Sequence, residues 1–292
     1  MYIITMRTKK CLSCIPTNKK VAKTSKKRAS WKQHIGLKTI FPNDTIPSLK
    51  SKVRSVSGAN QKVHLDLGPK KAGRKVLYYA SQDLPLDKCQ ELGVLGAIRA
   101  YGKFSNQGIA VLDAEGKGVL KIKCPMIYHE EGKTYLPHVH FILSNQNHTG
   151  WENKLLTQTV VCKLDFQDMV KVVKNQCALI VNALPFEYYV KDRIPHSVPL
   201  DHNMVLDSLD KKVVINYLES LLPHCPAVYQ SYQKGKIDLM DIPLVSYCYN
   251  TGCEADTDLQ EKLNQIGFTN VKVYEEGIVG WNKNMKKSKL KL

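Results

Sequence analysis

The chain has 292 residues, of which 43% are hydrophobic and 24% are charged. A chain of this length is too long to fold around a single ordinary hydrophobic core, so we expect two domains with accessory segments. No run of residues approaches the roughly 18 consecutive apolar positions of a membrane span, and the N-terminus lacks the apolar core and cleavage site of a secretory signal. These features exclude an integral membrane protein. They predict an intracellular protein, cytoplasmic, nuclear or virion-associated, that is not secreted.

The excess positive charge is confined to the start of the chain. Residues 1–75 contain 19 Lys and Arg but only 2 Asp and Glu, which accounts for the whole formal net charge of +17. Residues 1–60 lack a sustained apolar period and are rich in Ser, Thr and Lys, so they predict a disordered basic arm. Such an arm would bind nucleic acid or another polyanion through residues 1–75, unless it only keeps the chain soluble. Residues 284–292 form a smaller basic tail.

Short stretches rich in β-branched and aromatic residues follow the arm, separated by turn signals such as "DAEGKG". They are "KVLYYAS", "QGIAVLD", "GVLKIKCP", "HVHFILS" and "TQTVVCKL". Short strands at this spacing are typical of a β-sandwich, which we expect over residues 61–163.

Strands alternate with helices over residues 164–283. The predicted helices are "FQDMVKVVKN", "DSLDKKVVINYLESLL" and "EADTDLQEKLNQIG", and the predicted buried strands are "CALIVNAL", "IPLVSYCY" and "NVKVYE". The second helix should bury Val213, Val214, Tyr217, Leu218 and Leu221, and the third should bury Ala255, Leu259, Leu263 and Ile266 before it ends at Gly267. This alternation predicts a parallel sheet with helices on both faces.

Cys248 stands at the carboxyl end of a predicted strand, just before a polar loop and a helix. The chain has nine cysteines, an odd number that, without a secretory signal, predicts free thiols rather than a disulfide framework. Reactive groups of open α/β sheets lie at this edge, and amides at a helix start would lower the pKa of a thiol. Gly252 would let the loop fold closely around the sulfur. The alternative is an ordinary buried cysteine at a strand end.

The stretch "IPLVSYCYNTGCEADTDLQEKLNQIGFTNVKVYEEGIVGWN" resembles the second half of a rhodanese-like domain. The matching features are Cys248, Gly267-Phe268, Val271, Glu276-Gly277 and Trp281, and Glu187-Tyr188 and Ile194-Pro195 match the first half. The resemblance covers about residues 165–283, so it implies a sulfurtransferase fold for this part of the chain.

By this resemblance Cys248 is the nucleophile that carries sulfane sulfur as a persulfide. The loop around the sulfur would comprise Tyr249, Asn250, Thr251, Gly252 and Cys253. The sulfur donor and acceptor would be small molecules or protein thiols, and no cofactor is required. Cys253 would attack the persulfide or form a disulfide with Cys248, unless it is only a small side chain at the helix start.

Four positions depart from the family's pattern, and two of them, Arg193 and His196, replace the glycines around Ile194-Pro195. Asn182 stands where the first strand has an aspartate, and Tyr249 stands where an arginine often follows the cysteine. Without that arginine, a thiol persulfide is a better donor than thiosulfate, which is a dianion. Related phosphatases require an arginine six positions after the cysteine, where this chain has Glu254, so hydrolysis of phosphate esters is not expected.

His138 and His140 are two residues apart, so on a strand both point to one face. The stretch "GVLKIKCPMIY…LPHVHF…LLTQTVV" resembles the core of intradiol ring-cleavage dioxygenases, which are transthyretin-like sandwiches. By that resemblance Tyr128, His138 and His140 would bind iron, with Tyr101 the nearest candidate for a fourth ligand. The alternative is a binding or assembly module in which both histidines are ordinary polar residues.

The resulting fold class is an α+β multidomain chain, with a β-sandwich followed by a rhodanese-like α/β domain around a central parallel sheet. The first functional hypothesis is a rhodanese-like sulfurtransferase that its basic arm tethers to an acidic partner. The second is a catalytically silent rhodanese-like module within a viral or nucleoprotein assembly. The third is non-haem iron dioxygenase activity in the sandwich.

Overall fold

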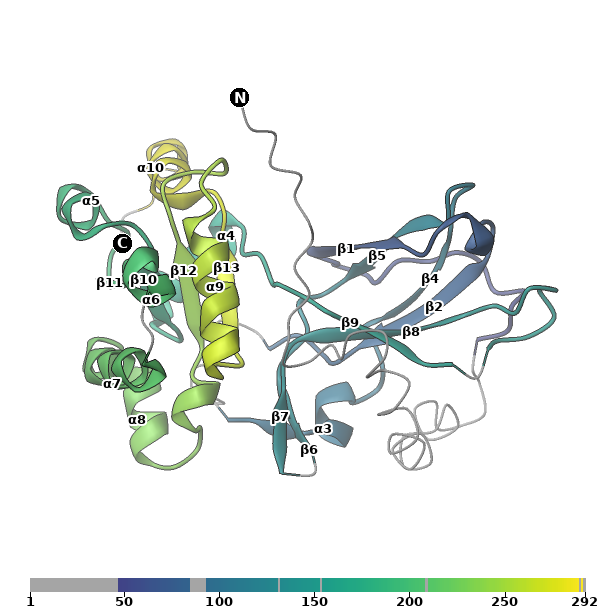
Figure 1. Cartoon of the computed structure of the whole chain (residues 1–292), viewed down its shortest axis with the longest axis horizontal. Coiled ribbons are helices and arrows are strands. Elements are labelled where there is room, and N and C mark those ends of the chain that lie inside the picture. The colour runs from purple at the N-terminus through teal and green to yellow at the C-terminus, as the bar shows by residue number, and fades with distance from the viewer. Residues whose placement is uncertain are drawn as a thin grey trace.

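The computed structural model describes residues 47–84, 93–130, 132–152, 154–207, 210–288 and 290. Figure 1 shows a β-rich region beside a region of helices packed around a sheet. The predicted basic arm up to residue 46 lies outside the described residues. Among the described helices, none has the length and apolar character needed to cross a membrane.

A four-stranded antiparallel sheet is the centre of the β-rich region. Its order is β4 (Gln107–Val111), β2 (Lys75–Ala80), β8 (His138–Leu143) and β9 (Leu156–Thr159). A separate antiparallel pair, β1 (Gln61–Asp66) and β5 (Lys117–Ile122), shares a hydrophobic core with one face of this sheet. The predicted strands are therefore present, and the sandwich class stays a prediction.

The second face of the four-stranded sheet is covered by different elements. They are β3 (Leu95–Gly96), α3 (Ala97–Tyr101), β6 (Tyr128–Glu130) and β7 (Lys133–Tyr135). The short helix η1 (Pro69–Lys71) follows β1 and contributes no residue to this core. Along β8 the side chains alternate as expected, because Val139, Phe141 and Leu143 belong to the core shared with β1 and β5. His138 and His140 lie on the opposite face and contact aromatic rings there.

Residues 47–60 belong to the β-rich region and not to a disordered arm. Val56 is buried in the core. Arg54 forms backbone hydrogen bonds with Ile109 in both directions, and the indole of Trp151 donates to the carbonyl of Pro47 at 2.8 Å. These contacts contradict the part of the prediction that extended the arm to residue 60, because this segment buries an apolar side chain and pairs its backbone.

Cys124 and Cys162 form a disulfide bond, so the prediction of free thiols is wrong for this pair. The bond joins the segment after β5 to the segment after β9. The carbonyl of Cys162 also accepts a backbone hydrogen bond from Val273, and the disulfide therefore lies where the two regions meet. Within the described part of the chain, Cys225, Cys248 and Cys253 are free.

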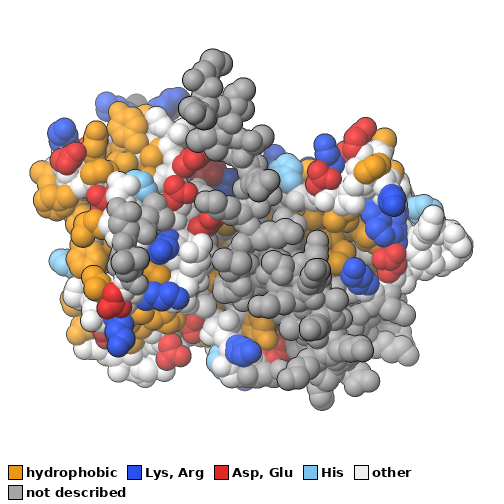
Figure 2. Space-filling view, viewed as in Figure 1, with side chains coloured by type: hydrophobic (Ala, Val, Ile, Leu, Met, Phe, Trp, Pro, Cys, Tyr) orange, Lys and Arg blue, Asp and Glu red, His pale blue; other side chains and the backbone are white. Residues whose placement is uncertain are grey.

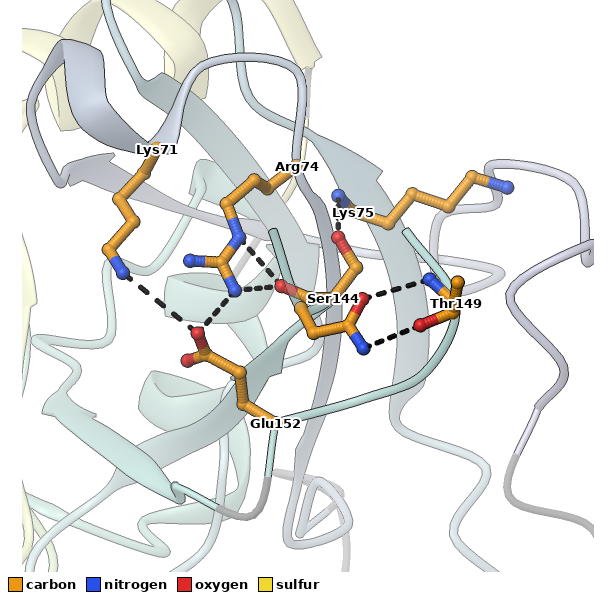
Figure 3. Close-up of polar contacts among 7 residues, drawn as sticks. Lys71, Arg74, Lys75, Ser144, Thr149 and Glu152 are labelled. Carbon is orange, nitrogen blue, oxygen red and sulfur yellow. Dashed lines mark hydrogen bonds and ion pairs between the residues drawn. The ribbon is translucent and has the colours of Figure 1, made fainter. Parts of the chain in front are cut away.

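A buried arginine connects the ends of β2 and β8 (Figure 3). Arg74 is 4% exposed, and its guanidinium donates to the carbonyl of Ser144 and to the carboxylate of Glu152. Lys71 approaches the same carboxylate only at 4.0 Å. The backbone amide of Lys75 donates to the hydroxyl of Ser144 at 3.1 Å. This cluster joins the start of β2 to the segment that follows β8.

The second region contains the predicted parallel sheet. Its order is β11 (Ser197–Pro199), β10 (Leu179–Asn182), β12 (Leu244–Tyr247) and β13 (Val271–Tyr274), and every neighbouring pair is parallel. Because consecutive parallel strands need crossover connections, helices cover the sheet and the carboxyl ends of the strands meet at one edge.

Helices pack on both faces of the parallel sheet (Figure 1). One face is covered by α4 (Phe166–Asn175) and α10 (Gly277–Ser288), and the other by α6 (His202–Asp207), α7 (Lys211–Leu221), α8 (Pro226–Gln233) and α9 (Ala255–Ile266). The remaining helices are α5 (Phe186–Lys191), η3 (Leu222–His224) and η4 (Leu239–Asp241). The side chain of Asp165 caps α4 by accepting from the amide of Asp168.

The helix faces agree with the sequence pattern except on α7. Ala255, Leu259 and Leu263 are buried on α9 as predicted. On α7, Val214 and Leu218 are buried, whereas Val213 and Tyr217 are exposed. A helix that contacts a single layer buries a narrow stripe, so the predicted face was too wide.

Hydrophobic side chains are also exposed on the parallel-sheet region (Figure 2). The most exposed on its helices α5, α6 and α7 are Phe186, Val190, Met204 and Val213.

Candidate functional site

Strand β12 ends at Tyr247 and places Cys248 at the head of a loop that leads into α9. Cys248 is 0% exposed, whereas the next residue, Tyr249, is 50% exposed. The loop is held from below by α10, since the amide of Ile278 donates to the carbonyl of Cys248 and the amide of Val279 to that of Tyr249, both at 3.0 Å. The predicted position at the carboxyl edge of the sheet is therefore correct, but the thiol is covered by its own loop.

The loop amides do not surround the sulfur in the way that the sequence suggested. The amide of Cys253 donates to the carbonyl of Asn250 at 2.9 Å, and the amide of Gly252 donates to the side-chain oxygen of Asn250 at 3.0 Å. The thiol of Cys248 itself points at two acceptors, the carbonyls of Asn250 at 3.6 Å and of Cys253 at 3.4 Å. The Cys248 thiol is therefore a hydrogen-bond donor in this conformation.

This placement reverses the expected change in acidity. Burial raises the pKa of the Cys248 thiol well above its ordinary value, and the side chain of Cys253 and the charge of Asp256 raise it further. A backbone hydrogen bond from Asp256 opposes the change. The prediction of a lowered thiol pKa is wrong for this conformation, because burial, the Cys253 side chain and the Asp256 charge outweigh the single backbone hydrogen bond that lowers the pKa.

Asp256 is a site residue that the sequence analysis missed. It lies in the first turn of α9 and is 1% exposed. Its Oδ1 accepts from the amide of Thr257 at 2.8 Å, while its Oδ2 is buried without a hydrogen-bond partner. Burial raises the pKa of Asp256 to about 6. Acidic residues are common in the first turn of a helix, so the sequence pattern gave no signal for this role.

A hydrogen-bond network lies beneath the loop. The amide of Asn182 donates to the hydroxyl of Tyr247 at 2.9 Å, and the same hydroxyl is 2.9 Å from the hydroxyl of Ser197 and accepts from the backbone amide of Ile194 at 3.1 Å. Asn182 also accepts from the amide of Leu184 at 2.9 Å. Asn182, which stands where rhodanese-like domains have an aspartate, thus joins the ends of β10 and β12.

Two glycines have different roles from those expected. A Cβ at Gly252 would meet only the side-chain oxygen of Asn250, at 3.4 Å. A Cβ at Gly277, where φ is +59°, would come within 2.6 Å of the carbonyl of Cys248 and 2.5 Å of the backbone of Tyr249. Close approach to the cysteine loop therefore requires glycine at position 277 rather than at position 252.

The β-rich region brings a second group of predicted residues together. The Nε2 atom of His138 lies 3.1 Å from Nε2 of His140, 3.1 Å from the hydroxyl of Tyr128 and 3.3 Å from the hydroxyl of Tyr101. All four residues are buried. They come from β8, β6 and α3. Tyr101, which was predicted only as the nearest candidate for a fourth ligand, therefore joins the other three. Burial raises the pKa of Tyr101 well above its ordinary value.

The outer nitrogens of both rings have partners. Nδ1 of His138 is 2.6 Å from the carbonyl of Leu136, and Nδ1 of His140 is 2.7 Å from the hydroxyl of Thr157. Because a carbonyl only accepts, Nδ1 of His138 carries the proton and the Nε2 lone pair faces the cluster. Within the described residues, no group of three or more His, Cys, Asp and Glu side chains is placed to hold a metal ion.

A cavity of about 480 Å³ lies where the two regions meet. Its lining includes the charged residues Asp83, Asp168, Lys123, Lys171 and Lys272. Burial raises the pKa of Asp83 and lowers that of Lys272, while the attraction between the two opposes both shifts. Charges of both signs thus compensate one another within this cavity.

A comparison with protein families identifies the second region. The family model described as Rhodanese-like domain matches residues 165–284. This part of the chain, with its parallel sheet and its cysteine after β12, is therefore a rhodanese-like domain. No curated protein matches the chain.

Solved structures are similar to part of the chain. An uncharacterised protein from Saccharomyces cerevisiae is 18% identical, with a TM-score of 0.32 over 46% of this chain and 100% of that one. A protein from Bacillus halodurans is 19% identical, with a TM-score of 0.30 over 42% and 72% of the two chains. A human single-domain sulfurtransferase is 14% identical, with a TM-score of 0.29 over 42% and 95%.

Proposed function

We propose that the rhodanese-like domain is a sulfurtransferase that carries sulfane sulfur as a persulfide on Cys248. The observation that supports this most directly is a free cysteine at the carboxyl end of the central strand β12, in a region that the rhodanese-like family model matches. The thiol attacks the outer sulfur of a thiol persulfide, the donor leaves as a thiol, and an acceptor thiol later removes the sulfur. Because Cys248 is buried, its loop must open before a donor can reach it.

Cys253 is the second cysteine of the proposed site. It is free, partly exposed, and close enough for its side chain to raise the pKa of Cys248. Attack of its thiolate on the inner sulfur of the persulfide would form a Cys248–Cys253 disulfide and release hydrogen sulfide, with the proton of Cys253 going to the leaving sulfur. In this proposal Cys253 ends the persulfide state when no acceptor is present.

Intact-protein mass spectrometry tests the persulfide directly. The protein is incubated with a thiol persulfide and, separately, with thiosulfate, and compared with Cys248→Ser and Cys253→Ser. We expect one added sulfur that cyanide removes, its loss in Cys248→Ser, and its longer lifetime in Cys253→Ser. Equal sulfur uptake by wild type and Cys248→Ser would disprove the function.

A catalytically silent module is the alternative for the same domain. The complete burial of Cys248 and the two carbonyls around its sulfur favour it. In this alternative the domain contributes only a binding surface, and the sulfur neither alkylates nor takes up sulfur. Absence of an adduct from either donor, with Cys248 also resistant to iodoacetamide in the folded protein, would support the silent module and reject sulfur transfer.

The second candidate function is metal binding by Tyr101, Tyr128, His138 and His140. Three polar groups lie within 3.3 Å of a single nitrogen lone pair on His138, which can accept only one good hydrogen bond. Two ligands that are each about 2.1 Å from one ion lie roughly 3 Å apart, so the spacing fits a shared ion. The hydrogen bonds at both Nδ1 atoms would hold the rings with Nε2 toward it.

The donor set of two phenols and two imidazoles fits iron, which the resemblance to intradiol dioxygenases also implies. Ferric iron held there would supply the activation of an aromatic diol for ring cleavage, and the four side chains would hold the ion and exclude water from it. Metal analysis of the purified protein, with a search for a visible tyrosinate-to-iron absorption band, tests this candidate. His140→Ala should abolish the band and the bound iron, and iron that is retained in this variant would reject the site.

For residues 1–75 we propose binding to a polyanion, with nucleic acid as the first candidate, on the basis of their excess of Lys and Arg. Affinity for single-stranded and double-stranded oligonucleotides, measured at increasing salt, should fall steeply with salt if this is correct. Affinity that is independent of salt would reject it.

A further inference from the structure

Asp256 is a buried carboxyl group beside the proposed nucleophile, and the structure gives it too few partners for a purely structural role. Asp256 is 1% exposed, and its Oδ2 atom has no hydrogen-bond partner. A buried polar atom without a partner costs stability, so its presence calls for an explanation. Its backbone carbonyl accepts from the hydroxyl of Ser246 at 3.1 Å, which fixes the start of α9 to strand β12, two residues before Cys248.

The Cys248 thiol needs a group that removes its proton. Its sulfur faces the carbonyls of Asn250 and Cys253, which can accept a hydrogen bond but cannot take up a proton at neutral pH. The amides of Gly252 and Cys253 are engaged with Asn250 and so do not stabilise a thiolate. The Asp256 carboxyl is close enough to the Cys248 side chain for the interaction between them to lower the pKa of Asp256, against the larger effect of burial.

We propose that Asp256 is the general base and general acid of sulfur transfer to Cys248, an inference that rests on the proposed function. The carboxylate takes the proton of the Cys248 thiol as its sulfur forms a bond to the outer sulfur of a thiol persulfide. The sulfur–sulfur bond of the donor breaks, and its electron pair goes to the departing thiolate. Asp256 then returns the proton to that thiolate, so the donor leaves as a neutral thiol and the carboxylate is regenerated.

The charges around Asp256 suit this cycle. The groups that act on its carboxyl are Cys248 from the end of β12, the amide of Thr257 on α9, and Glu275 after β13, whose negative charge raises the pKa of Asp256 together with burial. Cys253 acts on the Cys248 thiol from the loop. With a pKa of about 6, Asp256 is a stronger base than an exposed aspartate and is still ionised at neutral pH.

The test compares wild type, Asp256→Asn and, as a matched control, Asp258→Asn, which removes an exposed carboxylate from the same turn of α9. Rates of sulfur uptake are measured with an alkyl and with an aromatic thiol persulfide. An aromatic thiolate leaves without needing a proton. We expect Asp256→Asn to lose on the order of 10²-fold with the alkyl donor, a clearly smaller factor with the aromatic donor, and Asp258→Asn to match wild type.

The alternatives give different results. If the Asp256 carboxylate acts only through its charge, its removal lowers the pKa of Cys248, and Asp256→Asn is faster than wild type, which overturns the inference. Equal losses with both donors indicate a positioning role and also overturn it. If wild type takes up no sulfur from either donor, the proposed function itself fails, whereas uptake that Asp256→Asn leaves unchanged removes only the role of Asp256.

A measurement on wild type alone covers the case in which the variant does not fold. The rate with the alkyl donor should fall as the pH is lowered through about 6, because protonation of Asp256 removes the base. The same pH series with Asp256→Glu, which retains a carboxyl group, should keep a fall of this kind with a shifted midpoint. A wild-type rate that follows thiol ionisation alone, with no change near this pH, contradicts the inference.

Discussion

The two regions of this chain assemble their polar clusters in different ways. In the rhodanese-like domain, Cys248, Cys253 and Asp256 follow one strand within nine positions of sequence, because a parallel strand, its loop and the next helix meet at one edge of the sheet. In the β-rich region, Tyr101 and His138 are far apart in sequence and meet on the face of an antiparallel sheet. Local sequence therefore identifies the first kind of site, whereas the second depends on tertiary packing.

The regions also use cysteine differently. The β-rich region closes a loop of the chain with the Cys124–Cys162 disulfide. In the rhodanese-like domain Cys177 is also disulfide-bonded, whereas Cys225, Cys248 and Cys253 are free. The described cysteines of the β-rich region thus form a cross-link, whereas the rhodanese-like domain retains thiols that can react. Four changes, from the largest expected effect to the smallest, test the comparison between the two regions.

Removal of the disulfide should have the largest effect. The sequence separation between Cys124 and Cys162 is 38 residues. A loop of this length implies a loss of about 4 kcal/mol from the free energy of unfolding when both cysteines are replaced by alanine. Urea unfolding under non-oxidising and oxidising conditions measures it. The control Cys225→Ala, at a buried free thiol, should cost about 1 kcal/mol, and an equal cost for both changes would contradict a structural role for the cross-link.

Arg74→Met should be the next largest change. It leaves the buried carbonyl of Ser144 and the carboxylate of Glu152 without their donor, and breaking a buried ion pair costs about 3 kcal/mol. Lys71→Met is the control, since Lys71 is more exposed and lies 4.0 Å from the same carboxylate, so its loss should cost less than about 1 kcal/mol. Chemical unfolding of both variants decides whether this end of the β2–β8 pair depends on the arginine specifically.

The sequence predicted most of the rhodanese-like domain because its signals are local. The strand that ends at Tyr247, the loop and the helix that ends at Gly267 each have a distinct pattern of apolar residues and turns. It did not predict the direction of the Cys248 pKa shift, because that depends on how deeply the sulfur is buried and on the side chains packed around it. Asp256 was missed because an acidic residue at a helix start usually interacts only with the helix dipole.

In the β-rich region the strands were predictable but their partners were not. The pair His138 and His140 follows from the period of a strand, and Val139 and Phe141 lie on the other face. The disulfide was not predictable, because the number of cysteines says nothing about which two come together in space.

Gly277→Ala should damage the cysteine loop from outside it. The added Cβ would come within 2.6 Å of the carbonyl of Cys248, and the backbone φ of +59° is one that residues with a side chain rarely adopt. Strain and overpacking together should cost about 2–3 kcal/mol and should expose Cys248 to alkylation. Gly252→Ala, whose Cβ would have its nearest contact at 3.4 Å, is the control and should behave like wild type. Similar alkylation rates in both variants would show that α10 does not hold the loop.

The smallest change concerns pH. The pKa of Asp256 is about 6 in the folded chain, whereas that of an exposed aspartate is 3.8. The folded state binds the Asp256 proton more tightly than the unfolded state does. Protonation of Asp256 therefore stabilises the folded state fully below the pKa of Asp256 in the unfolded chain, and this stabilisation is lost as the pH rises through about 6. At neutral pH the ionised carboxylate should therefore cost up to about 3 kcal/mol, a value that penetration of water into the site would reduce.

Asp256→Asn removes this cost, so it should be more stable than wild type at neutral pH and equally stable near the unfolded pKa. Urea unfolding of both proteins across this pH range measures the difference, and Asp258→Asn should show none, because Asp258 is exposed. A variant that is less stable at neutral pH would mean that Asp256 supports the fold. A variant that gains stability but loses sulfur transfer would mean that the rhodanese-like domain keeps a destabilising carboxylate for its chemistry, in contrast to the β-rich region, where the buried Arg74 is paired.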